Sequence, residues 1–122
     1  MKILNLTQHD ATPNQIEDGV IEPEHDEKES IKRLLTFNVK PEKDDIEARA
    51  WLLSDIALRS KCKAVMIGGA PFLMPELSKC LKERGIRVLF SFSLRKSIEK
   101  PNEKDGSVEK VSVFEHIGFV EI

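Results

Sequence analysis

The stretch KAVMIGGAPFLMPELSKCLKERGIRVLFSF, residues 63–92, predicts the fold most directly. It opens with a short apolar run, breaks at Gly68-Gly69, and continues with leucines at helical spacing to a second apolar run at 86–92. Gly85 supplies the left-handed conformation that ends such a helix. A strand, a helix and a strand within roughly 30 residues predict two parallel strands joined by a right-handed crossover.

The residues before this unit add a strand and two helices. An apolar run at Ile3–Thr7 indicates a first buried strand. The hydroxyl before a proline at Thr12-Pro13 is typical of a helix start, so we expect a short helix that ends at Asp18, before a glycine. A long apolar stripe at helical spacing predicts a helix over Asp44–Ser60.

Two further segments are mainly polar. From Glu22 to Glu29 five acids accompany one lysine, a local charge of −4, which predicts a solvated loop before a helix at Glu29–Leu35. Near the C-terminus, Asp105-Gly106 is a hairpin signal, and Phe119–Ile122 is apolar enough for a last strand. The tail should therefore form an antiparallel appendage to the sheet.

The composition favours one α/β domain over residues 1–122. The chain is 40% hydrophobic and 33% charged, and a chain of this length buries a core. A net charge of −2 argues against a basic coat for duplex nucleic acid. No segment approaches the roughly 18 apolar residues of a membrane span or has a signal-peptide core, so we expect a cytoplasmic protein without a membrane partner. Cys62 and Cys80 are expected to be reduced thiols.

Three polar segments follow predicted strands and should meet at one edge of the sheet. They are Thr7–Asp10, Gly68–Ala70 and Ser91–Lys96. In an open α/β sheet, ligands gather at the carboxyl ends of the parallel strands. The two glycines let backbone N–H groups approach an anion, beside the positive end of a helix that starts near Pro71. A purely structural tight turn is the alternative for these glycines.

A basic pair adds to this predicted rim. The window from Lys79 to Lys104 holds eight basic and three acidic residues, a local charge of +5. Arg95 can grip two phosphate oxygens while Lys96 acts as a mobile point charge, so the pair suits an oligophosphate. A solvated hairpin arm is the alternative.

His9 and His116 are candidate proton carriers. A neutral imidazole can shuttle a proton in phosphodiester cleavage, while a hydroxyl of Thr7, Ser91 or Ser93 donates a hydrogen bond to the phosphate. A metal site built on the two histidines and Asp10 would lack the spacing of known metal motifs, so we expect no metal and no cofactor. His116 has a second reading as a structural residue at a strand bend. No Gly-x-Ser-x-Gly elbow supports acyl transfer.

Six short motifs occur in an order that resembles one known family. They are Leu6-Thr7-Gln8, Gly68-Gly69, Arg95, Glu99, Asp105-Gly106-Ser107 and Phe114-x-His116. In this arrangement the chain, mainly its second half, looks like the small stand-alone CRISPR-associated proteins, among them the ring nucleases of type III systems. It departs from their pattern at Ser91-Phe92-Ser93, where the family has a pair of threonines.

The resemblance implies a Rossmann-like three-layer sandwich with a mostly parallel sheet and a C-terminal antiparallel hairpin. It also implies a role in antiviral defence: binding and cleaving cyclic oligoadenylate, the second messenger of type III CRISPR systems. The attacking group would be a ribose 2′-OH of the ligand, so the chemistry requires no metal. Because the ring has rotational symmetry, the family binds it across a homodimer, and each rim would supply half of the site.

The resemblance also implies a role for each candidate residue. Arg95, with Lys96, would neutralise the charge of the phosphorane, and His9 or His116 would carry the proton. The groups expected to contact phosphate, ribose or base are Thr7, Gln8, Gly68, Gly69, Ser91 and Ser93. Two alternatives stay open: a module that binds or sequesters a nucleotide without cleaving it, and a phage- or plasmid-borne protein-interaction domain.

Overall fold

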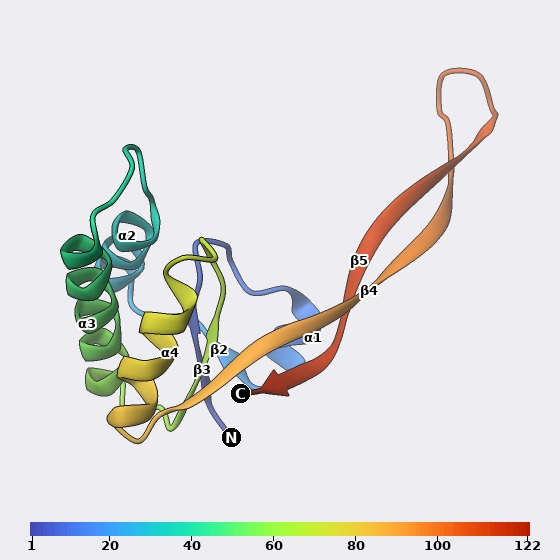
Figure 1. Cartoon of the computed structure of the whole chain (residues 1–122). Helices are drawn as coiled ribbons and strands as arrows, with labels where there is room; N and C mark the ends of the chain where they lie inside the picture. Colours follow the sequence, from blue (N-terminus) through green and yellow to red (C-terminus); the bar gives the residue numbers. More distant parts are fainter.

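The sheet has five strands in the order β2-β1-β3-β4-β5 in the computed structural model, which describes residues 1–122 (Figure 1). Four strands are parallel, and the last is antiparallel to its neighbour. They are β1 (Ile3–Leu6), β2 (Val20–Ile21), β3 (Ala64–Ile67), β4 (Arg87–Pro101) and β5 (Val108–Glu121). The predicted α/β class, with a mostly parallel sheet and a C-terminal antiparallel pair, is confirmed.

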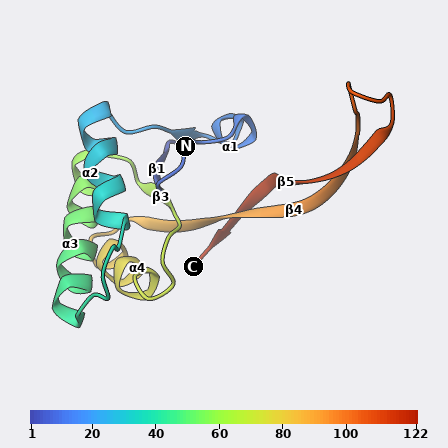
Figure 2. The ribbon, with the colours of Figure 1, turned by 90° about the horizontal axis from the view of Figure 1, so that it is seen from above.

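Three of the four helices pack on the same face of the sheet. The helices are α1 (Pro13–Glu17), α2 (His25–Leu35), α3 (Lys43–Arg59) and α4 (Met74–Glu83). Figure 2 shows α2, α3 and α4 together on one side, with α1 apart on the other side of β1. α1 has five residues and none of them is buried, so the three-layer sandwich stays a prediction. No helix in the structure has the length and apolar character needed to span a bilayer.

The core follows the alternation of side chains along the strands. Val65 and Ile67 of β3 face the helices and belong to a cluster of 16 buried residues. Ala64 and Met66 point the other way, into a cluster of five buried residues that Phe119 of β5 partly covers. Most of the apolar burial therefore lies between the sheet and α2, α3 and α4.

Two helices begin elsewhere than the sequence predicts. The expectation of a solvated loop from Glu22 to Glu29 is wrong, because α2 begins at His25 and its residue Lys28 is buried. α4 begins at Met74 rather than near Pro71, after a turn in which the N–H of Leu73 donates to the carbonyl of Ala70. The positive end of α4 is thus displaced along the chain from the glycine pair.

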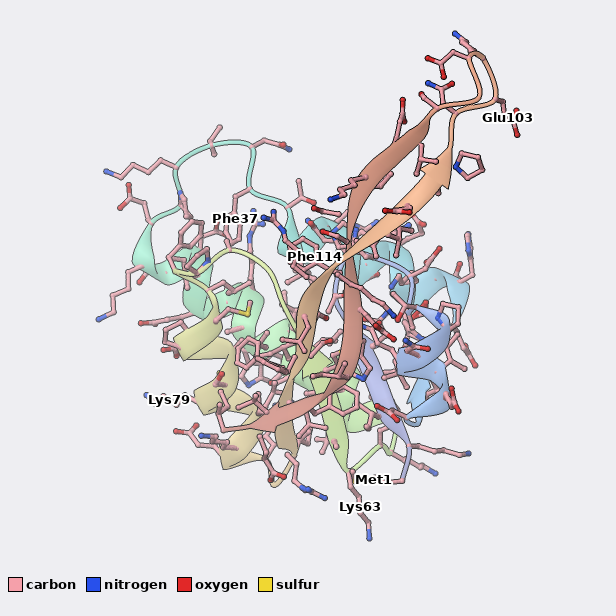
Figure 3. The ribbon with its side chains drawn as sticks, turned by 90° about the vertical axis from the view of Figure 1, so that its right-hand side faces the viewer. Met1, Phe37, Lys63, Lys79, Glu103 and Phe114 are labelled. Carbon is pink, nitrogen blue, oxygen red and sulfur yellow. The ribbon has the colours of Figure 1, made fainter.

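The last two strands extend far beyond the rest of the sheet. β3 pairs with β4 only at Arg87–Leu89, and from Phe90 onward β4 pairs with β5 alone. A bulge interrupts this pairing between Phe92 and Ser93. We call residues 94–115, beyond the bulge, the arm. Figures 1 and 3 show the arm projecting away from the helices, with Glu103 near its tip.

The hairpin turn lies where the sequence predicts it. Gly106 has a φ of 73° at the tip of the arm, and the Asn102 N–H donates to the carbonyl of Ser107 at 2.6 Å. The run predicted as a separate last strand, Phe119–Ile122, is instead the end of the continuous β5.

Candidate ligand-binding site

Thr7 and Gly68 directly follow the ends of β1 and β3, and Ser91 lies beside them within β4, at the level where β3 ends. The register pairs Leu6 with Ile67 and Met66 with Leu89. Extending the first pair by one residue places Thr7 beside Gly68, and extending the second pair by two residues places Gly68 beside Ser91. A Cβ added to Gly68 would lie 3.6 Å from Cγ2 of Thr7. The expected meeting of the three segments is therefore realised at these residues.

These strand ends enclose a cavity of about 520 Å³. Its walls are Thr7, Gln8, His9, Asp10, Thr12, Gln15, Met66, Ile67, Gly68, Gly69, Phe90 and Ser91. In the order β2-β1-β3-β4 the strand connections change direction between β1 and β3, which is where open α/β sheets bind ligands. The volume falls within the range of small-molecule sites. No lysine or arginine lines the cavity, so backbone N–H groups and neutral side chains would provide most of its contacts.

The fully buried Asn5 shapes the loop that follows β1. Its Oδ1 accepts from the Thr7 N–H at 3.1 Å and from the Thr7 hydroxyl at 2.7 Å. Its Nδ2 donates to the His9 carbonyl at 2.7 Å and to Oε1 of Glu22 at 2.6 Å. The hydroxyl of Thr7 therefore donates its hydrogen bond within the loop, and it stabilises the conformation of the loop.

Lys28 of α2 also holds this loop in place. Its buried ammonium donates to the carbonyls of Thr7 at 3.2 Å and His9 at 2.9 Å, and it lies 3.6 Å from Oε1 of Glu22. Oε2 of Glu22 accepts from the N–H of Ala11 at 3.2 Å. Because a buried charge requires such partners, Lys28 and Glu22 hold the loop in one conformation.

Gln15 joins α1 to the opposite wall of the cavity. Thr12 and Gln15 form a capping box: the Gln15 N–H donates to the Thr12 hydroxyl at 3.3 Å, and Oε1 of Gln15 accepts from the Thr12 N–H at 3.0 Å. This bond orients the side-chain amide, and its Nε2 donates to Oγ of Ser91 at 3.2 Å. The cap of a short helix thus positions a donor at the cavity.

Ser91, His116 and Asp18 form a chain of hydrogen bonds behind the cavity wall. Oγ of Ser91 lies 2.6 Å from Nδ1 of His116, and Nε2 of His116 lies 2.8 Å from Oδ2 of Asp18. The His116 side chain is 2% exposed and packs against Phe119 with 4.7 Å between ring centres, whereas the Asp18 side chain is 46% exposed. The imidazole therefore has both nitrogens engaged and no direct contact with the cavity.

Six of the predicted site residues line the cavity: Thr7, Gln8, His9, Gly68, Gly69 and Ser91. The other four do not. Ser93 pairs with His116 beyond the cavity, and His116 contacts it only through Ser91. Lys96 lies 3.5 Å from Glu115 and lines a separate cavity of about 380 Å³ between α1 and the arm.

Arg95 lies on the arm, away from Gly69. Its guanidinium is 5.6 Å from the ring centre of Phe114, which Figure 3 labels where the arm leaves the body of the molecule. The reason is the length of β4: it continues through Phe92 to Pro101, so Arg95 and Lys96 are strand residues and not part of a rim loop. The basic pair that the sequence predicted at the rim is therefore absent from this cavity.

The structure brings no group of three or more His, Cys, Asp or Glu side chains close enough to hold a metal ion. In particular, the metal set considered from the sequence is not assembled. His9 and Asp10 line the cavity, whereas His116 is buried behind Ser91.

Four residues that shape the site were not predicted. The spacing of Thr12 and Gln15 is a recognisable capping signal and could have indicated Gln15. Lys28 is the single lysine among the acids of 22–29, which is a weak signal. No motif in the sequence marks Asn5 or Asp18, and the bonds of Asn5 to Glu22 and of Asp18 to His116 join segments far apart in the chain.

One family model matches the chain. It describes the uncharacterized protein MJ1673 family and covers residues 1–120. No curated protein and no solved structure matches.

Proposed function

The chain belongs to the uncharacterized protein MJ1673 family, and from its cavity we propose that it binds a cyclic oligoadenylate and opens the ring by attack of a ribose 2′-OH. The observation that carries this proposal is the row formed by Thr7 and Gly68, which follow the ends of β1 and β3, and Ser91 of the adjacent β4, at the point where the connections change direction. Such a row offers backbone N–H groups, hydroxyls and amides to one ligand.

The cavity suits the parts of a nucleotide. The backbone N–H groups at Gly68 and Gly69 approach a phosphate without side chains in the way. Gly69 has a φ of 155°, and a Cβ there would lie 3.4 Å from both Leu35 and Met74, so the position favours glycine. Gln8 and Gln15 offer amide donors and acceptors to ribose or base, and Phe90 gives an apolar surface.

The proposed reaction is an internal transesterification. The 2′-oxygen forms a bond to the adjacent phosphorus while the bond from phosphorus to the 5′-oxygen breaks. The products are a 2′,3′-cyclic phosphate and a 5′-hydroxyl, and His9, exposed on the loop after β1, would give the leaving oxygen its proton. Lys96, in the cavity next to α1, would attract a neighbouring phosphate of the ring. The symmetry of the ring fits a homodimer with two such cavities.

The test is incubation of the purified chain with cyclic tri-, tetra- and hexa-adenylate in EDTA, with products identified by mass spectrometry. We expect one of the rings to give a linear product that ends in a 2′,3′-cyclic phosphate. Gly68→Val should abolish cleavage because its side chain enters the cavity, whereas Gly68→Ala places a Cβ only 3.6 Å from Cγ2 of Thr7, an ordinary contact, and should retain most of it. Intact rings in every incubation would contradict the proposed cleavage.

The lack of a cationic side chain in the cavity favours a second candidate, a sensor that binds the ring and releases it intact. Neutral donors are enough to bind the ground state of the ligand. Without a cation, however, the cavity has few groups to stabilise the extra negative charge of the transition state. Calorimetry that detects binding, lost in Gly68→Val, together with the absence of any product, would favour this candidate over the enzyme.

A further inference from the structure

We propose that Ser91, His116 and Asp18 form a proton relay that withdraws the proton from a hydroxyl group bound in the cavity. The three residues come from β4, β5 and the end of α1, and 98 residues separate Asp18 from His116. Their alignment therefore depends on the tertiary fold and is not a by-product of one turn or one hairpin.

The hydrogen bonds along this chain all point in one direction. The Asp18 carboxylate can only accept, so the hydrogen of His116 lies on Nε2 and its Nδ1 is an acceptor. Nδ1 then takes the hydrogen of the Ser91 hydroxyl at 2.6 Å. Nε2 of Gln15 donates to the oxygen of that same hydroxyl. A proton that enters at Ser91 is thus drawn toward Asp18, as in a nucleophile, base and carboxylate triad.

Ser91 has one acceptor site left for a ligand. A hydroxyl oxygen has two lone pairs, and the structure gives Oγ a single donor, Nε2 of Gln15. Ser91 also lines the cavity beside Gly68, so a bound hydroxyl can donate to the remaining lone pair. The ring of His116 does not reach the cavity, which makes Ser91 the catalytic residue and the other two positioning residues.

The reaction of the relay rests on the proposed function, in which the bound hydroxyl is the ribose 2′-OH. Its proton passes to Oγ of Ser91 as the serine proton passes to Nδ1 of His116, and Asp18 stabilises the imidazolium. The 2′-oxygen bonds to phosphorus, the bond to the 5′-oxygen breaks, and the leaving oxygen takes a proton from His9. His116 then returns its proton through Ser91 to solvent and His9 takes one up from solvent, so the enzyme is unchanged after each turnover.

The first test does not require the natural ligand. An alkyl fluorophosphonate reacts with a base-activated serine: the serine oxygen bonds to phosphorus, and fluoride leaves while His116 takes the serine proton. Mass spectrometry should find the adduct on Ser91, and Asp18→Asn should slow its formation about tenfold or more because the tautomer is no longer fixed. Ser97→Ala on the arm is the matched control and should label at the normal rate. No adduct at Ser91, or equal rates in the two variants, would overturn the relay.

The second test uses the ring that the wild-type chain cleaves. Ser91→Ala and Asp18→Asn should each lower kcat, by about 100-fold for the serine variant, with KM changed little. His116→Ala should be partly restored by added imidazole, which a purely structural histidine would not show. Because His116 is buried, the thermal midpoint of the His116→Ala chain is measured first. If that variant is unfolded, the test uses Asp18→Asn, since the Asp18 side chain is half-exposed.

The outcomes separate the two proposals. A ring cleaved at the normal rate by Ser91→Ala would overturn the relay and leave the proposed function standing. Labelling of Ser91 that depends on Asp18, with all rings left intact, would support the relay and contradict ring cleavage.

Discussion

Side chains alternate between the two faces of the strands in both the body of the molecule and the arm, but they are buried mainly in the body. The body holds nearly all of the buried residues, and beyond Leu89 only His116 is buried. On the arm, Leu94 is 51% exposed and Phe114 is 72% exposed. The body therefore supplies the hydrophobic stabilisation and frames the cavity, whereas the arm is held chiefly by the hydrogen bonds between β4 and β5.

The largest expected effect is a difference in stability between the same substitution, leucine to alanine, made in the body and in the arm. Leu77→Ala should destabilise the protein by about 2–5 kcal/mol, because it removes a fully buried side chain between α4 and the sheet. Leu94→Ala on the arm should change the free energy of unfolding by no more than about 0.5 kcal/mol. Urea unfolding of both variants measures the difference. Equal losses would break the distinction between body and arm.

A smaller effect is expected at the polar support of the cavity. Lys28→Met removes the buried ammonium that donates to the carbonyls of Thr7 and His9 and neutralises Glu22, and it should cost about 1–3 kcal/mol. Lys32→Met on the same helix is the control, since that side chain is 44% exposed and should contribute nothing measurable. Thermal unfolding and ligand binding are measured together, and a Lys28→Met chain as stable as Lys32→Met would show that the loop is held by other contacts.

Shortening the arm should change stability less than either body substitution. Replacing residues 96–113 by Asn-Gly joins Arg95 to Phe114, which face each other in the hairpin, through a two-residue turn. No residue in the removed segment is buried, so the free energy of unfolding should stay within about 1 kcal/mol of the full chain. Failure of the shortened chain to fold would make the arm part of the folding unit.

The smallest expected effect lies at the end of the β4–β5 pair opposite the arm, where β4 begins and β5 ends. The hydrogen bond from Arg87 to Glu121 lowers the pKa of Glu121 below its ordinary value of about 4.3. A lowered pKa means that the stabilisation is present above the unfolded pKa and is lost as the pH falls through the folded one. The free energy of unfolding of wild type should slightly exceed that of Glu121→Gln at pH 7, and the difference should shrink as the pH falls below the ordinary pKa of glutamate and in high salt. A difference that grows in acid would contradict this assignment.

Local sequence signals predicted the parts of the fold that local interactions determine. The β3-α4-β4 unit, the cap of α1 by Thr12 and the left-handed Gly85 with a φ of 76° follow from patterns a few residues long. The meeting of Thr7, Gly68 and Ser91 also follows, since parallel strands bring their carboxyl ends to one edge.

The remaining features depend on contacts between distant segments. Lys28 looks solvated among its acidic neighbours, and only the carbonyls of the β1 loop make its burial favourable. Ser91 and His116 were candidates, but the bond from His116 to Asp18 requires α1 to pack against β5. The length of β4 was missed because Ser91–Lys96 was interpreted as a segment that follows the strand, whereas pairing with β5 keeps these residues extended.

β1 is made early on the ribosome but lies in the middle of the sheet. Its partner β3 follows about 60 residues later, as the pairing of Leu4 with Val65 shows, and Ser91 follows later still. At typical elongation rates of about 5–20 residues per second, the apolar β1 waits several seconds for its second neighbour. During that interval β1 has β2 as its only possible neighbour in the sheet, and the binding cavity cannot form until Gly68 and Ser91 have been synthesised.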